Sequence, residues 1–115
     1  MHTKSRQTVM VVEDVEWIRR SMGSTLRGLG YRVVETSDAA EAVEAAGAQP
    51  PDVIVTDEDL PTLAELMEWV RAPGALHGVP VTIINPDKEE GERLGDIILL
   101  PDFELIATLL NGARR

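Results

Sequence analysis

The chain has 115 residues, the size of a single domain. Its hydrophobic content of 43% is sufficient for a core, and because only 3% of residues are aromatic, that core is expected to be aliphatic. The net charge of −9 disfavours direct binding to nucleic acids and to anionic membranes. The absence of cysteine excludes disulfides, thiol catalysis and thiolate metal sites, and no apolar run approaches the roughly 20 residues of a membrane span. We therefore expect a cytoplasmic protein.

Five short runs rich in β-branched residues are predicted to be strands, and they alternate with segments whose apolar residues recur at helical spacing. The predicted strands are 8–13, 31–36, 52–56, 80–85 and 97–100. The predicted helices are 15–29 and 38–46, one that begins at Thr62, and a last one that begins at Asp102. Residues 1–7 are predicted to be a polar tail, residues 8–111 the domain, and residues 112–115 a second tail.

Several residues mark the ends of these helices. Asp38 with Glu41, and Thr62 with Glu65, have the three-residue offset of a capping box. Gly30 follows the first helix and is suited to a left-handed C-cap.

One segment lacks the pattern of either a helix or a strand. Residues 86–96, PDKEEGERLGD, contain a single aliphatic residue, Leu94, so a helix there would have no apolar face to bury. We predict a loop or one frayed turn.

Acidic residues close two of the predicted strands. Glu13 and Asp14 end the first, VMVVED, and Asp57 ends the third, VIVTD. The alternation of strands and helices indicates a parallel sheet with helices on both faces, in which the carboxyl ends of neighbouring strands meet at one edge. Three crowded carboxylates need a cation or shifted pKa values. The sequence therefore predicts a Mg²⁺ pocket at this edge.

These segments, in this order, resemble the receiver domain of two-component response regulators. The stretch VVEDVEWIRRSMGSTLRGLGYRVVET is similar to the family's first strand, acid pair, first helix and second strand. TSDAAEAV resembles the start of its second helix, PPDVIVTDEDLP its phosphoacceptor strand and turn, and VPVTIIN its fourth strand. The resemblance implies a flavodoxin-like, doubly wound α/β fold with a five-stranded parallel sheet in the order 2-1-3-4-5, its fourth helix shortened or absent.

The resemblance also implies roles for individual residues. Asp57 would accept a phosphoryl group from a sensor histidine kinase or a histidine phosphotransfer protein. Glu13 and Asp14 would hold Mg²⁺ together with Asp57 and the backbone carbonyl of Asp59, in keeping with the preference of this ion for oxygen ligands. On the first helix, core packing and contact with the phosphotransfer partner are both open for Ile18 and Met22.

Three positions depart from the family pattern. Asn85 stands where the family has a Ser or Thr that contacts the phosphoryl group, and its amide can still donate a hydrogen bond. Leu100 replaces a lysine and cannot pair with phosphate, and Ile97 occupies the aromatic switch position. Lys88, just after Asn85, is a candidate to replace the lysine.

The function expected from these features is that of a stand-alone receiver that signals by contact with a downstream protein target and is not an enzyme. One alternative is a pseudo-receiver whose binding does not depend on phosphate. A less favoured alternative is a Mg²⁺-dependent phosphatase, because Asp57 and Asp59 form an Asp-x-Asp pair similar to that of haloacid dehalogenases, and the acid-ended strands are also similar to Toprim domains. Half-buried packing is expected for Trp17 and Trp69, although exposure would indicate a partner surface. A missing fourth helix would favour a homodimer.

Overall fold

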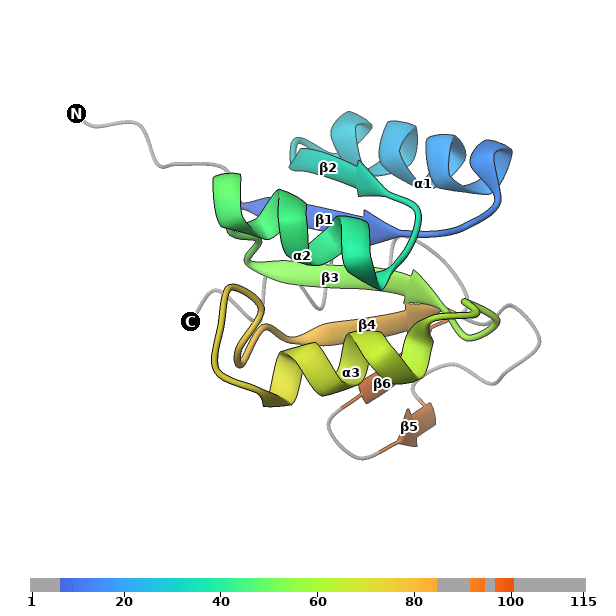
Figure 1. The fold of residues 1–115 in the computed structure, drawn as a ribbon. Helices are drawn as coiled ribbons and strands as arrows, with labels where there is room; N and C mark the ends of the chain where they lie inside the picture. Colours follow the sequence, from blue (N-terminus) through green and yellow to red (C-terminus); the bar gives the residue numbers. More distant parts are fainter. Residues whose placement is uncertain (1–6, 85–91, 95–96, 101–115) are drawn as a thin grey trace.

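The computed structural model describes residues 7–84, 92–94 and 97–100. They form an α/β fold with a six-stranded sheet in the order β2-β1-β3-β4-β6-β5 (Figure 1). The strands are β1 Thr8–Val12, β2 Arg32–Thr36, β3 Val53–Asp57, β4 Val81–Ile84, β5 Glu92–Leu94 and β6 Ile97–Leu100. The helices are α1 Glu16–Gly28, α2 Ala39–Ala48 and α3 Leu63–Arg71. The predicted fold class and the order of its parallel strands are confirmed, with β6 as the fifth parallel strand.

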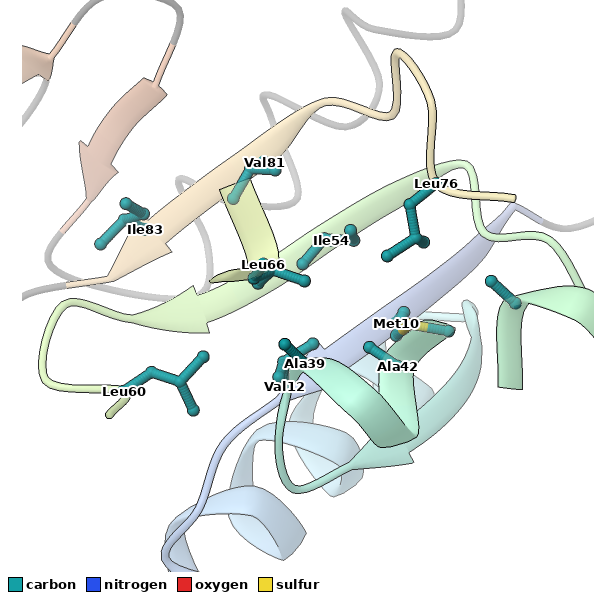
Figure 2. Packing of buried hydrophobic residues seen from close by; sticks show 11 residues of the cluster. Met10, Val12, Ala39, Ala42, Ile54, Leu60, Leu66, Leu76, Val81 and Ile83 are labelled. Atoms are coloured by element: carbon teal, nitrogen blue, oxygen red, sulfur yellow. The ribbon is translucent and has the colours of Figure 1, made fainter. Parts of the chain in front are cut away.

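Helices cover both faces of the sheet, with α2 and α3 on one face and α1 on the other (Figure 1). Successive side chains of a strand point to opposite faces, and β1 is buried along its whole length. Met10 and Val12 pack with Ile54 of β3 against α2 and α3 (Figure 2). Val9 and Val11 pack against Met22 and Leu26 of α1 and form the core on the opposite face.

The sheet contains one strand that the sequence did not predict. β5, Glu92–Leu94, pairs antiparallel with β6, with Leu94 opposite Ile97. The prediction of a loop or frayed turn is therefore wrong for these three residues. A three-residue strand with one aliphatic side chain has too little alternation to be recognised from sequence.

The helix ends agree with the sequence at two of three positions. Gly30 has a positive φ of 99° and follows α1, as predicted. The Asp38 side chain accepts from the Glu41 N–H at 2.8 Å, which confirms the cap of α2. Thr62 does not cap α3 with its side chain, and its Oγ1 instead accepts from the N–H of Ala39, the first residue of α2.

Some predicted features lie outside the described residues. These are the tail up to residue 6, Asn85, Lys88, and the last helix with the C-terminal tail. Within the described part, no helix is both long and apolar enough to cross a membrane.

The packing of α1 on β2 leads to a prediction about Gly23. A Cβ atom added there would collide with the Glu35 carboxylate, whose Cδ would lie 2.8 Å away, and Glu35 forms an ion pair with Arg27 at 2.7 Å. Gly to Ala in a helix normally stabilises by up to about 1 kcal/mol. We expect Gly23→Ala to stabilise the protein by less than this, because the Glu35 side chain must move. In a Glu35→Ala background, the same substitution should give the full stabilisation.

Urea unfolding of the two single variants and the double variant measures this coupling. Gly28→Ala is the control, since nothing lies within 4 Å of its added Cβ. A Gly23→Ala effect that is equal in both backgrounds would contradict the prediction.

Candidate functional site

The strand register brings the predicted acids to one edge of the sheet. Val12 of β1 pairs with Thr56 of β3, so Glu13 and Asp57 are the next residues along two adjacent parallel strands. Thr56 reinforces this alignment, because its buried hydroxyl donates to the carbonyl of Val12 at 2.7 Å. The arrowheads of β1, β3 and β4 point to the same end of the sheet, where open α/β sheets bind ligands (Figure 1).

Glu13 is held in place through three of its polar groups and is only 1% exposed. Its N–H donates to the carbonyl of Thr36 in β2 at 3.0 Å. Its Oε2 accepts from the N–H of Val15 at 3.0 Å, and its backbone carbonyl accepts from Nη1 of Arg19 at 2.9 Å. Both the direction of the Glu13 side chain and the start of the β1–α1 loop are therefore fixed.

The electrostatics of Glu13 are those of a crowded acid. Its pKa is raised from an ordinary value of 4.5 to about 7, first because burial disfavours the charged form. The N–H of Val15 opposes this rise in pKa, whereas the neighbouring carboxyl groups of Asp14 and Asp57 add to it. The carboxylates of Asp14 and Asp57 are therefore close enough to Glu13 to influence it.

Asp57 and Asp14 remain accessible at this edge, since Asp57 is half-buried and Asp14 is exposed. Oδ1 of Asp57 accepts from the N–H of Asp59 at 2.8 Å, and its backbone carbonyl accepts from the N–H of Leu60 at 3.0 Å. This turn fixes the direction of the Asp57 carboxylate at the carboxyl end of β3.

The donor set fits a small hard cation. Oε1 of Glu13 is buried and has no hydrogen-bond partner among the described residues, which is an unfavourable state that a cation or a proton would relieve. Over residues 7–84, 92–94 and 97–100, no three acidic or histidine side chains converge tightly enough to form a ready-made metal cluster. Mg²⁺ keeps several waters and needs only one or two carboxylates, so Glu13, Asp14 and Asp57 suit it. The contribution of the Asp59 carbonyl stays a prediction.

The residues proposed for partner contact on α1 divide into two groups. Met22 is 2% exposed and packs in the core beneath α1, so its prediction as a partner-docking residue is wrong. Met22 lies one helical turn after Ile18, and the same spacing puts it on the side of α1 that faces the sheet. Ile18 is only partly buried against that core.

Trp17, for which half-buried packing was predicted, is 73% exposed, and Trp69 of α3 is 40% exposed.

The departures from the family pattern are placed through the backbone. Ile84 of β4 pairs with Asp57 on one side and with Leu100 of β6 on the other. Leu100 is thus two strands from Asp57 in the same row, at the carboxyl end of its strand. Ile97 begins β6.

Arg19 is a residue of the site that the sequence did not reveal. Its guanidinium reaches back six positions to the Glu13 carbonyl, a spacing that belongs to no regular pattern. Arg20, beside it, has the same chemistry, so residue type alone gave no signal.

Comparison with known proteins identifies the family. The model of the response regulator receiver domain matches residues 9–94, and the chain belongs to this family. It is 31% identical over 86 residues to the KDP operon transcriptional regulatory protein KdpE of Escherichia coli, and 27% identical over 89 residues to the polar-differentiation response regulator DivK of Brucella anthropi. These alignments cover 75% and 76% of this chain, 38% of KdpE and 72% of DivK.

A solved structure agrees with this assignment. The receiver domain of the sensor histidine kinase PA1611 from Pseudomonas aeruginosa, described with a magnesium ion coordinated in its active site cleft, has a TM-score of 0.73. It is 26% identical, and the match covers 96% of this chain and 100% of that domain. The chain is therefore a receiver domain of the kind used in two-component signalling.

The raised pKa of Glu13 predicts a pH-dependent stability. The folded state binds this proton more tightly than the unfolded state, so its stabilising contribution is complete below pH 4.5 and is lost as pH rises through about 7. Glu13→Gln removes the ionised form. The compared quantity is the free energy of unfolding of Glu13→Gln minus that of wild type, both without divalent cations. We expect this difference to increase by about 1–3 kcal/mol as pH rises from about 5 to about 8.

Urea unfolding in a chelating buffer at the two pH values measures the difference. Glu16→Gln is the control, because its side chain lies on the first turn of α1 and is 66% exposed. A difference between Glu13→Gln and wild type that is the same at both pH values would refute the prediction.

Proposed function

We propose that this receiver accepts a phosphoryl group on Asp57 from a sensor histidine kinase or a histidine phosphotransfer protein, with Mg²⁺ as cofactor. The observation that carries the proposal is the position of the half-buried Asp57 at the end of β3, beside the buried Glu13, whose pKa its negative charge helps to raise. The domain would act as a cytoplasmic signalling module and not as an enzyme, and would pass its signal by contact with a protein target.

The chemistry follows from the arrangement of the carboxylates. An oxygen of Asp57 attacks the donor's phosphorus, and the new O–P bond forms as the N–P bond of the phosphohistidine breaks. The imidazole leaves and takes up a proton. Oδ1 is engaged by the Asp59 N–H, which favours Oδ2 as the attacking atom. Mg²⁺, held by Glu13 and Asp14, would neutralise charge on the phosphoryl oxygens.

Leu100, in place of the family lysine, should impair the conformational change that follows phosphorylation more than phosphorylation itself. A hydrogen bond to a charged group contributes about 1.5–3 kcal/mol, whereas switching a two-state domain from 1:99 to 99:1 needs about 5.5 kcal/mol. The family lysine would supply a large share of that difference, and leucine cannot. A pseudo-receiver that binds its partner without phosphate is the second candidate, and Leu100 at the end of β6 favours it.

The proposed docking surface for the phosphoryl donor is the part of α1 beside the acids. Trp17 is largely exposed there, next to the partly buried Ile18 and one turn from the acidic loop. A large exposed aromatic residue is a common centre of binding energy in protein interfaces.

Intact mass after incubation with acetyl phosphate and Mg²⁺ tests the proposed phosphorylation. We expect wild type to gain one phosphoryl group, and Asp57→Asn to gain none. Asp59→Asn is the matched control, since it changes an acid in the same turn but keeps the backbone carbonyl. Folded wild-type protein without any gain would reject phosphorylation and favour the pseudo-receiver.

The docking surface gives a separate prediction. Trp17→Ala should leave labelling by acetyl phosphate unchanged, because this small donor needs no protein contact. Transfer from a histidine kinase that phosphorylates the wild type should fall by about tenfold or more in kcat/KM. Trp69→Ala, which changes the exposed tryptophan of α3, is the control. Equal kinase rates for both variants would show that Trp17 is not part of the docking surface.

A further inference from the structure

The start of α1 lacks the usual means of stabilising a helix end. Its N-cap residue, Val15, makes no side-chain capping hydrogen bond, whereas Asp38 caps α2. An uncapped helix start with an exposed loop before it should fray. This loop carries both acids of β1, so its geometry determines where their carboxylates point.

The side chain of Arg19 binds this loop from the first turn of α1. Its backbone N–H donates to the carbonyl of Val15 at 2.9 Å, and its Nη1 donates to the carbonyl of Glu13 at 2.9 Å. The backbone bond is the regular first bond of the helix, so the side-chain bond is the contact that depends on arginine. The Glu13 carbonyl belongs to the peptide that joins Glu13 to Asp14, so holding it fixes the orientation of that peptide.

We propose that Arg19 is a positioning residue that holds the Glu13–Asp14 loop in the geometry needed to bind a divalent cation. This inference rests on the proposed function. The Glu13 N–H and Oε2 have partners in β2 and at Val15, but the carbonyl is held by the side chain of Arg19. At this loop the Arg19 side chain therefore acts as a hydrogen-bond donor to a backbone carbonyl.

The positioning role and a purely electrostatic role predict opposite results. If Arg19 acted only as a nearby positive charge, its removal would strengthen cation binding by reducing repulsion. If it positions the loop, its removal weakens cation binding although a positive charge is lost. Arg20→Met separates the two effects, because Arg20 is a neighbouring exposed cation paired with Glu16 rather than with the loop.

The experiment is a titration of the full chain with Mg²⁺ by isothermal calorimetry, for wild type, Arg19→Met, Arg19→Lys and Arg20→Met. We expect Arg19→Met to weaken binding by about threefold to tenfold, the effect of losing one hydrogen bond. Arg19→Lys should retain most of the affinity, since a single N–H···O bond does not need the guanidinium fork. Hydrogen exchange of the Asp14 and Val15 amides should accelerate in Arg19→Met, while unfolding by urea matches that of Arg20→Met.

Each outcome is decisive. Equal or tighter Mg²⁺ binding by Arg19→Met, with wild type binding normally, overturns the role of Arg19 and leaves the proposed function intact. Weaker binding by Arg20→Met to the same degree shows that the loss does not depend on the bond to the Glu13 carbonyl, and also overturns it. A folded wild type that binds no Mg²⁺ overturns both the inference and the magnesium-dependent function.

Discussion

The parallel register of β1 and β3 is the constraint on which the site depends. Both strands are buried on two faces, so their sequences show no polar alternation that would set the register. Instead, packing in the two cores determines the register, because Met10 and Val12 pack on the face covered by α2 and α3, whereas Val9 and Val11 pack on the face covered by α1. A slip of one residue would exchange these sets and separate Glu13 from Asp57. The packing of aliphatic side chains thus sets the electrostatics of the acidic edge.

This arrangement places an acid where it is poorly solvated. Glu13 is buried with an oxygen that has no hydrogen-bond partner among the described residues, close to two further carboxylates, whereas most of the buried side chains around the sheet are aliphatic. The unfavourable charge is concentrated at the carboxyl edge, where a cation and a phosphoryl group would meet. Sites of this kind commonly combine function with a local loss of stability.

Most of the fold could be predicted from the sequence, because periodicity and acids at strand ends are local signals. The cap at Asp38 and the turn at Gly30 were predicted for the same reason. The errors concern information that a local pattern does not contain. Met22 lies on a helical stripe that serves the core, and the partner of the Thr62 hydroxyl lies 23 residues away. The sequence indicated crowded acids, but burial decided that Glu13 would be the one with the raised pKa.

The hydrogen bond of Thr62 has a consequence for the order of folding. Asp38 and Thr62 satisfy separate N–H groups at the start of α2, those of Glu41 and Ala39. The second acceptor comes from the residue before α3, so α2 acquires its complete cap only after β3 has paired and the turn beyond Asp57 has formed. A chain arrested before Thr62 would lack the side-chain acceptor of the Ala39 N–H. The second half of the domain therefore completes a helix encoded in the first half, which makes folding of the two halves cooperative.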